Sequence, residues 1–285
     1  MSAAPSAPSL RFSANLGFLW RDLPLLERIE RAARAGFQGI EMHWPYEEDP
    51  DAVATLCQKH GMSVLSINTP QGDVAAGDSG LAAQRGRQEE FRDAFLMTLD
   101  WAVRSTASMI HVLPGKRNVE ATRISENHFP SADNPVDSGQ FDCFVKNLQW
   151  ASDQARAHGK GLLLEAINGR DKPGYFYHTQ EAAHAVLTAC NRSNIRLMFD
   201  VYHVGVAQGD VLNRLERFIP SIGHVQIAGV PDRNEPDRGE ICYRAVFEKL
   251  ISLGYTGWIG CEYRADAGIE SGLSRWTKSC AVTLG

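Results

Sequence analysis

The sequence has no compact block of basic residues and no long uninterrupted apolar run. Lysine and arginine together number 29 against 34 aspartates and glutamates, and the formal net charge is −5. Nucleic acids are bound through clustered Lys and Arg side chains, so this balance argues against a DNA or RNA partner. A membrane-spanning helix needs about 20 apolar residues, so we expect no contact with a membrane.

Cysteine pairs of the CxxC type are also missing. The six cysteines are scattered through apolar segments, which is typical of reduced thiols in the core of an intracellular protein, and we expect a cytoplasmic location. Residues 1–9 are small and proline-rich but lack the charged start and apolar stretch of a signal peptide. We expect these residues to form a disordered leader.

A pattern of helix, glycine and strand recurs along the rest of the chain. In each copy an amphipathic stretch with helical spacing is followed by a glycine and then by a short apolar run. A glycine at this place is typical of a helix C-terminus. The clearest copies are RAARAGFQGIEMH, LCQKHGMSVLSIN, ARAHGKGLLLEAI and LISLGYTGWIGCEY, with glycines Gly36, Gly61, Gly159 and Gly254.

Extending this pattern predicts eight strands that alternate with helices. The expected strands are Arg11–Asn15, Gln38–Met42, Ser63–Asn68, Met109–Leu113, Gly161–Glu165, Ile195–Asp200, Gly223–Ile227 and Trp258–Glu262. The expected helices include Leu23–Ala35, Asp51–His60, Gln88–Ser105, Phe141–His158, Gln180–Cys190 and Tyr243–Leu253. This alternation favours an α/β fold, a single (β/α)8 TIM-barrel domain over residues 10–285. A dinucleotide-binding fold is disfavoured because no GxGxxG motif follows the first strand.

One segment does not fit the alternation. The span from Pro114 to Gly139 is rich in Pro, Gly and Asn and shows little periodicity. It is too long for a bare connection, so we interpret it as an insertion over one end of the barrel. It either covers a site or is an excursion without a role.

Polar side chains end four neighbouring strands of the expected barrel. They are Glu165, Asp200, Gln226 and Glu262. Active sites of TIM barrels lie at the carboxyl ends of the strands, and alternate strand residues point into the barrel. If Glu165 points inward, Leu162 and Leu164 face the helices. The same alternation suits the other three strands, so we expect the four side chains to converge.

Three carboxylates in one barrel mouth repel one another unless another charge compensates them. A divalent cation does so, and a site of three carboxylates and an amide oxygen suits a hard ion such as Mg²⁺ or Mn²⁺. The sequence therefore predicts a divalent metal ion bound by these four side chains. The alternative is that each acid is isolated, either exposed or paired with a nearby Arg or Lys.

Longer motifs around these residues resemble the hydroxypyruvate isomerase family of sugar isomerase-like TIM barrels. The resemblance is carried by HVQIAGVPDRNEPDRGEI from His224 and GYTGWIGCEY from Gly254, with NLGFLW, GFQGIEMHWPY, HVLPG and LLLEAIN elsewhere. It implies a metal bound by the same four side chains, with Glu165 and Glu262 also acting as the acid/base pair. The related 2-oxo-tetronate isomerases share these motifs.

The resemblance implies a reaction in which hydroxypyruvate and tartronate semialdehyde interconvert through an enediolate. One of the two glutamates would remove a carbon-bound proton and the other would return one to the neighbouring carbon. The hydroxy- or oxo-acid substrate needs a donor for its carboxylate, and Arg233 in the VPDR loop is our first candidate. Further substrate contacts are expected from His111, His203 and Asn68.

Other functions are compatible with the same residues. A 2-oxo-tetronate isomerase, a ketose 3-epimerase or an inosose dehydratase would use two carboxylates and a cation in the same way. The epimerases usually carry histidine where this chain has Gln226, which favours the isomerase. Endonuclease IV-like repair enzymes need a histidine-rich multi-zinc centre, which this set does not match. A barrel that binds a sugar acid without turnover is the non-enzymatic alternative, and a homodimer is compatible with the fold.

Overall fold

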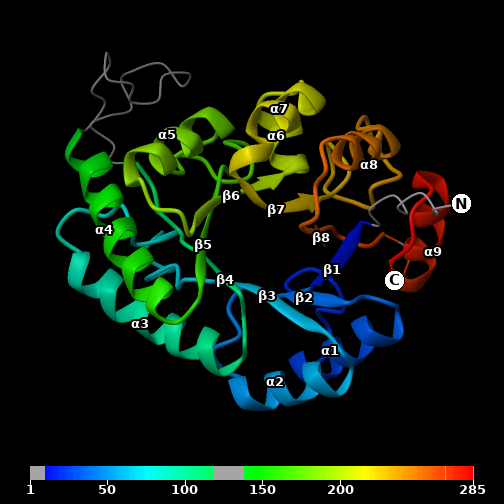
Figure 1. Cartoon of the computed structure of the whole chain (residues 1–285), viewed down its shortest axis with the longest axis horizontal. Coiled ribbons are helices and arrows are strands. Elements are labelled where there is room, and N and C mark those ends of the chain that lie inside the picture. The colour runs from blue at the N-terminus through cyan, green and yellow to red at the C-terminus, as the bar shows by residue number, and fades with distance from the viewer. Residues whose placement is uncertain (1–9, 118–137, 267, 285) are drawn as a thin grey trace, which may run out of the picture.

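A computed structural model describes residues 10–117, 138–266 and 268–284. Eight parallel strands close into a barrel in chain order (Figure 1). The strands are β1 (Arg11–Asn15), β2 (Gly39–Glu41), β3 (Ser63–Asn68), β4 (Met109–His111), β5 (Gly161–Glu165), β6 (Ile195–Asp200), β7 (Ile222–Ile227) and β8 (Trp258–Cys261). The predicted single-domain TIM barrel is confirmed. The predicted leader, residues 1–9, lies outside the described residues.

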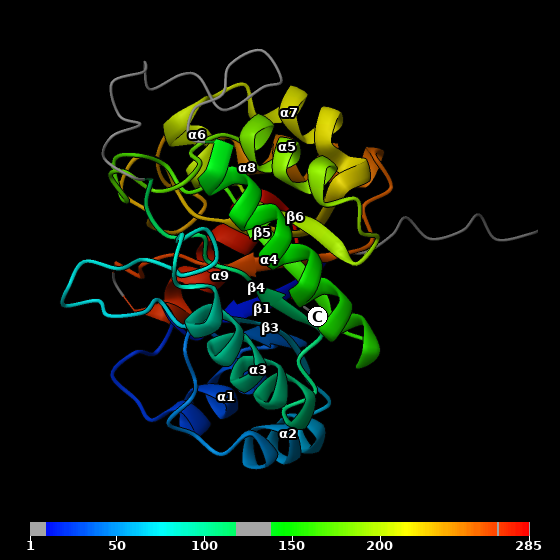
Figure 2. The ribbon, with the colours of Figure 1, turned by 90° about the vertical axis from the view of Figure 1, so that its left-hand side faces the viewer.

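Helices surround the ring of strands, as Figures 1 and 2 show from two directions. They are α1 (Leu25–Arg34), α2 (Pro50–Lys59), α3 (Gln88–Arg104), α4 (Ser138–Ala157), α5 (Gln180–Cys190), α6 (Val201–Ala207), α7 (Val211–Phe218), α8 (Tyr243–Ser252) and α9 (Ile269–Cys280). Within the described ranges, none of them combines the length and the apolar character that a bilayer crossing requires.

Three helices, α6, α7 and α9, were not among the helices named individually from the sequence. Helix α6 starts directly after β6, because the Asp200 side chain accepts a 2.8 Å hydrogen bond from the Tyr202 N–H and caps the helix. Because no loop separates β6 from α6, the two-residue spacing of the strand passes directly into the helical spacing, and the sequence shows no boundary between them. Strand β8 ends at Cys261, so Glu262 lies one residue beyond the strand instead of closing it.

The register between neighbouring strands determines how far along the barrel axis each polar side chain lies. Asp200 pairs with Gln226 across β6 and β7, and Gln226 pairs with Gly260 across β7 and β8. Glu165 pairs with Met198, two residues before Asp200. Because side chains alternate along a strand, this register directs the predicted residues of β5, β6 and β7 into the same end of the barrel.

Loops that follow β3, β4 and β5 are joined by backbone bridges at that end of the barrel. Gly80 bridges to Pro114, and Lys116 bridges to Tyr175. We call residues 79–80, 113–117 and 174–176 the bridged wall. The predicted insertion from Pro114 to Gly139 contributes its first residues to this wall, and most of the rest lies outside the described residues.

The bridge between Gly80 and Pro114 requires glycine. The φ of Gly80 is +137°, and a Cβ there would overlap the carbonyl oxygen of Leu113. Gly80→Ala is therefore expected to lower the free energy of unfolding by about 3 kcal/mol, from backbone strain and overpacking together. Urea unfolding followed by circular dichroism measures this loss.

Gly61→Ala is the matched control, because Gly61 also has a positive φ, +65°, but nothing lies within 4 Å of its missing Cβ. This variant should lose only the backbone contribution, about 1 kcal/mol. If the free energy of unfolding falls equally in the two variants, the close contact between the loops at Gly80 does not contribute to the loss.

Candidate active site

A cavity of about 370 Å³ opens at the carboxyl ends of the strands, in the size range of small-molecule sites. Most of the residues predicted for the site line it: Glu165, Gln226, Glu262, Arg233, His111, His203 and Asn68. Asp200 lies behind this surface, with 1% of its area exposed. The structure therefore brings every predicted site residue into or directly behind one cavity.

Asp200 is shared between helix α6 and the site. Its Oδ1 caps the helix, while its Oδ2 lies 3.3 Å from Arg233 Nη2 and 3.5 Å from His203 Nε2. Burial raises the pKa of Asp200 to about 7, although the Arg233 charge acts in the opposite direction. The backbone capping bond holds one oxygen in place and leaves the other facing the cavity residues.

Glu165, at the end of β5, is a buried carboxylate with two histidine neighbours. Its Oε2 lies 3.6 Å from His111 Nδ1 and its Oε1 lies 3.6 Å from His203 Nε2. Within the described residues, Oε1 makes no hydrogen bond. Burial, together with the negative charges of Glu262 and Asp200, raises the pKa of Glu165 well above its ordinary value.

Glu262 has the opposite environment, although it is also buried. Asn15 Nδ2 donates a 2.9 Å hydrogen bond to its Oε2, and Arg233 Nη2 lies 2.5 Å from its Oε1. Burial acts to raise the pKa of Glu262, but the Arg233 charge and the His43 contact outweigh it and lower the pKa below its ordinary value. The two glutamates thus prefer different protonation states in one cavity.

Arg233 supplies the positive charge between Glu262 and Asp200. Its guanidinium carbon lies 4.6 Å from the ring centre of Phe18 and 4.8 Å from that of Tyr202, so its positive charge contacts two aromatic rings. Burial opposes its charge, yet the negative charges of Glu262 and Asp200 raise the pKa of Arg233. Its Nε has no partner among the described residues.

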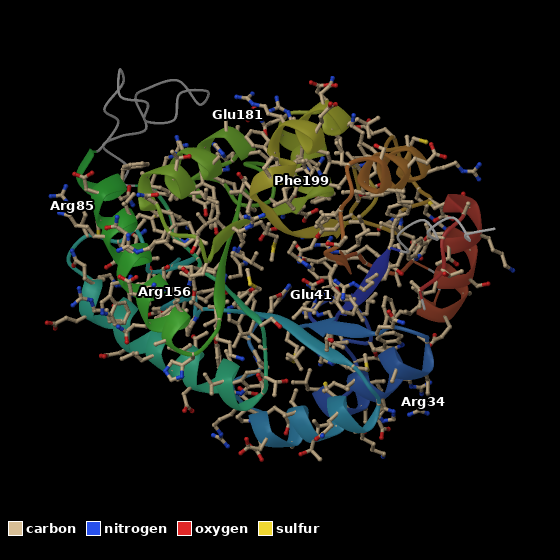
Figure 3. The ribbon with its side chains drawn as sticks, in the orientation of Figure 1. Arg34, Glu41, Arg85, Arg156, Glu181 and Phe199 are labelled. Carbon is tan, nitrogen blue, oxygen red and sulfur yellow. The ribbon has the colours of Figure 1, made fainter. Side chains whose placement is uncertain are left out.

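Glu41, at the end of β2, lies beneath the site in the middle of the ring of strands (Figure 3). Its Oε2 accepts hydrogen bonds from Gln226 Nε2 at 2.8 Å and from His224 Nε2 at 3.0 Å, and Ser13 Oγ lies 3.3 Å from Oε1. Gly260 leaves the space, since a Cβ there would overlap the Glu41 carboxylate. His224 is therefore a buried histidine that is hydrogen-bonded within the barrel interior.

The Glu41 carboxylate fixes the orientation of Gln226. A carboxylate only accepts hydrogen bonds, so the Gln226 amide must turn its NH₂ group toward Glu41. Its carbonyl Oε1 then faces away from Glu41, and this buried oxygen has no hydrogen-bond partner within the described ranges. Gln226 therefore offers an oxygen ligand at the site.

His203 is held in one tautomer by Asn168. Asn168 Oδ1 accepts a 2.9 Å bond from the Asp171 N–H, so its Nδ2 is the group that lies 2.6 Å from His203 Nδ1. With a donor at Nδ1, the neutral ring carries its hydrogen on Nε2, which faces Glu165 and Asp200. Burial lowers the pKa of His203 well below its ordinary value, and Arg233 acts in the same direction.

His111 and Asn68 stand at the ends of β4 and β3 and contact one another. Asn68 Oδ1 lies 3.2 Å from His111 Nδ1. Burial lowers the pKa of His111 to about 3, so its ring is neutral. Sequence reasoning named both residues as substrate contacts, whereas it assigned no role to Asn168 and His43, which fall within the motifs LLLEAIN and GFQGIEMHWPY.

The ligand atoms of Glu165, Asp200 and His203 lie within 4.8 Å of one another, which is a spacing that suits a metal ion. Glu165 and Asp200 belong to the predicted metal site, whereas His203 was predicted to contact substrate. Glu262 lies near this cluster, because the Arg233 guanidinium contacts both Asp200 and Glu262. The cluster fits a metal ion without establishing which one.

The chain matches the family described as xylose isomerase-like TIM barrels over residues 29–280. The chain belongs to the xylose isomerase-like TIM barrel family. Within this family it is similar to a 2-oxo-tetronate isomerase from Cupriavidus necator, with 38% identity over 94% of this chain and 97% of the relative. The hydroxypyruvate isomerase of Escherichia coli is 34% identical over 94% of this chain and 98% of that protein.

A solved structure of the same family supports the fold in detail. A protein from Brucella melitensis described as an AP endonuclease of family 2 has a TM-score of 0.84 and 37% identity, covering 95% of this chain and 98% of that chain. The resemblance to the hydroxypyruvate isomerase group is thereby confirmed, and this member of the xylose isomerase-like family is an isomerase.

Glu41 is expected to stabilise the floor of the site in this xylose isomerase-like barrel. Glu41→Gln replaces an acceptor of three side-chain donors by a group that carries donors of its own. The free energy of unfolding should fall by about 2 kcal/mol, because buried donors lose their partner. Urea unfolding in the presence of a chelator measures this effect without a contribution from bound metal.

Glu47→Gln serves as the control, since Glu47 follows the same strand but is exposed. It should change stability by no more than about 0.5 kcal/mol. If both variants unfold at the same urea concentration as the parent protein, the three contacts of Glu41 do not contribute to stability.

Proposed function

We propose that the chain is a metal-dependent isomerase that interconverts a short 2-oxo-3-hydroxy acid with its isomer, with hydroxypyruvate and tartronate semialdehyde as the simplest pair. The observation that carries this proposal is the pair Glu165 and Glu262, which share one cavity but have pKa values displaced in opposite directions. Two carboxyl groups poised in this way suit proton removal and proton return.

Four oxygen-bearing side chains would hold the metal: Glu165, Asp200, Gln226 and Glu262. Two buried oxygens that have no hydrogen-bond partner in the described part of the chain, Glu165 Oε1 and Gln226 Oε1, fit this role. An all-oxygen set suits Mg²⁺ or Mn²⁺, and such an ion supplies Lewis-acid stabilisation of an enediolate. His203, whose Nε2 hydrogen faces Glu165 and Asp200, fits a donor that orients these carboxylates or the substrate better than it fits a ligand.

The proposed reaction moves one proton between neighbouring carbons. Arg233 and Asn15 favour the ionised form of Glu262, so Glu262 is suited to take the proton from C3 of the 2-oxo acid. The electron pair forms the enediolate, and return of a proton to C2 with transfer of the hydroxyl hydrogen between the two oxygens completes the exchange of carbonyl and hydroxyl. Glu165, on the other side of the cavity, is suited to donate at C2.

Arg233 is proposed to anchor the substrate carboxylate through its Nε, which has no partner among the described residues, with His111, His203 and Asn68 as further contacts. Its contacts with two aromatic rings hold the guanidinium in place, and a guanidinium binds a planar carboxylate well. Lys172 and Arg264 also line the cavity and add positive charge at its exposed edge.

A second candidate, 2-oxo-tetronate isomerisation, is favoured by the Cupriavidus necator relative of that name. It uses the same chemistry on an acid one carbon longer. A ketose 3-epimerase is less well supported, because Gln226 stands where epimerases usually carry histidine. A nuclease of the endonuclease IV type is also disfavoured, since the metal-suited cluster found in the described residues contains one histidine.

Glu165→Gln and Glu262→Gln are expected each to lower kcat for hydroxypyruvate isomerisation by at least about 100-fold, because an amide can neither take nor return the proton. Conversion is followed by proton NMR with Mg²⁺ or Mn²⁺ present. Glu89→Gln, an exposed change in the first turn of α3, controls for the loss of a carboxylate elsewhere and should keep full activity.

Unaltered turnover in both site variants would rule out the acid/base pair. A parent protein that binds these acids with a metal but never converts them would instead support the alternative of a sugar-acid-binding barrel without catalysis.

Metal binding is expected to release protons. In the metal-free protein burial raises the pKa of Asp200 to about 7 and that of Glu165 well above its ordinary value, so both carboxyl groups hold protons that a cation must displace. Apparent Mn²⁺ affinity should therefore rise with pH between about pH 6 and 8, with on the order of one proton released per ion. Calorimetry in two buffers of different ionisation enthalpy counts these protons.

Asp200→Asn provides the comparison for this titration, since it removes one of the two protonated groups. It should release fewer protons and bind Mn²⁺ more weakly. Mn²⁺ binding without proton release at pH 6.5 would contradict the proposed ligand set.

Cytoplasmic location is also part of the proposal. All six cysteines are free, five of them buried and Cys242 exposed, which fits a reducing compartment. The proposed partners are a small hydroxy or oxo acid and a divalent cation, with no nucleic acid or membrane involved, and a homodimer is compatible with this assignment.

A further inference from the structure

Three neutral side chains line the cavity without a role in the proposed proton transfer. They are Ser79, His111 and Tyr175, with 4%, 2% and 1% of their surface exposed. Ser79 Oγ, His111 Nε2 and the Tyr175 hydroxyl have no hydrogen-bond partner among the described residues. A buried polar group without a partner costs about 1 to 3 kcal/mol, so three in one cavity indicate that a ligand satisfies them.

The bridged wall holds these groups in fixed positions. Ser79 precedes the Gly80 bridge to Pro114, and Tyr175 forms the bridge to Lys116. Hydrogen bonds from the Arg117 N–H to the Gly174 carbonyl and from the Phe176 N–H to the Gly115 carbonyl hold the backbone on both sides of Tyr175. His111 ends β4, directly before this wall. The three groups therefore lie on rigid backbone at one side of the cavity.

Their hydrogen-bonding capacities suit a hydroxyl group. His111 Nδ1 faces two acceptors, Asn68 Oδ1 at 3.2 Å and Glu165 Oε2 at 3.6 Å, so it carries the ring hydrogen and Nε2 is left as an acceptor. The Tyr175 phenol is a donor and the Ser79 hydroxyl can donate or accept. A bound hydroxyl group can give its hydrogen to His111 and accept from the other two.

A carboxylate fits this corner poorly. It has no hydrogen for His111 Nε2, and the three groups bring no positive charge to offset it. Glu262, whose ionised form Arg233 favours, faces the same cavity with Arg233 beside it, and Lys172 and Arg264 stand at the exposed edge. The acid group of a substrate is therefore expected near Arg233, and an uncharged end near Tyr175.

We propose that Ser79, His111 and Tyr175 form a neutral subsite that binds a substrate hydroxyl group beyond the two reacting carbons. The assignment of the reacting carbons rests on the proposed function. Hydroxypyruvate carries its hydroxyl on a reacting carbon and leaves the subsite without a partner, whereas a four-carbon 2-oxo-3,4-dihydroxy acid has a terminal hydroxyl to place there. The subsite then selects by chain length, with Ser79 and Tyr175 as residues that determine specificity.

Binding of unreactive analogues tests this subsite without turnover. Calorimetry with Mn²⁺-loaded protein compares glycerate, which has three carbons, with 2,3,4-trihydroxybutanoate, which has one hydroxymethyl group more. The parent protein should bind the longer acid more tightly. Tyr175→Phe should reduce this preference about 10-fold, since a buried donor to the extra hydroxyl is lost, and Ser79→Ala should reduce it in the same direction.

Tyr255→Phe is the matched control, because Tyr255 is another buried tyrosine, and its hydroxyl donates to the Trp258 carbonyl away from the cavity. The control should keep the parent preference. An unchanged preference in both Tyr175→Phe and Ser79→Ala, with folded protein by circular dichroism, would overturn the subsite.

Turnover measurements separate this outcome from failure of the proposed function. The ratio of kcat/KM for the four-carbon and three-carbon 2-oxo acids should fall in Tyr175→Phe. If the parent protein converts both acids and the ratio stays constant, the subsite is wrong and the isomerase proposal stands. If the parent converts neither acid, the proposed function fails, and the analogue binding preference still decides the subsite.

Discussion

Burial of several carboxylates at one end of a barrel is the constraint on which the rest of the site depends. Glu41, Glu165, Asp200 and Glu262 are each at most 6% exposed. Like charges so close cannot all remain ionised without compensation. Different partners compensate them: donors from neighbouring strands for Glu41, Arg233 and Asn15 for Glu262, and a helix N-terminus for Asp200. Glu165 retains an oxygen that accepts no hydrogen bond from the residues that the structure describes.

These different environments give chemically similar side chains separate roles. Arg233 lies beside Glu262 and lowers its pKa despite burial, while Glu165 lies 3.6 Å from each of two histidines and has a raised pKa. Glu41 lies deeper, where it orients Gln226. The site thus combines a carboxylate that Arg233 keeps ionised, a carboxyl group with a raised pKa, and buried oxygens that have no hydrogen-bond partner among the described residues, which is the combination on which the proposed proton transfer rests.

The bridged wall adds a second kind of surface to this charged floor. Gly80 and Gly115 allow two loop backbones to meet where no side chain would fit, and the Lys116 bridge extends the contact to Tyr175. The cavity therefore has charged groups near the strand ends and at its exposed edge, and it has the neutral groups Ser79 and Tyr175 on the bridged wall. A substrate with an acidic end and a hydroxylated end matches this division.

The sequence by itself determined the barrel and the residues at its carboxyl end, because strand alternation and glycine-terminated helices are local signals that repeat along the chain. It did not reveal α6, because Asp200 both ends a strand and caps that helix. Only the tertiary structure decided that Glu41 orients Gln226, that Asn168 sets the tautomer of His203, and that Ser79 and Tyr175 share a cavity wall. These contacts join residues far apart in the chain, and their geometry depends on barrel closure, which leaves no periodic trace in the sequence.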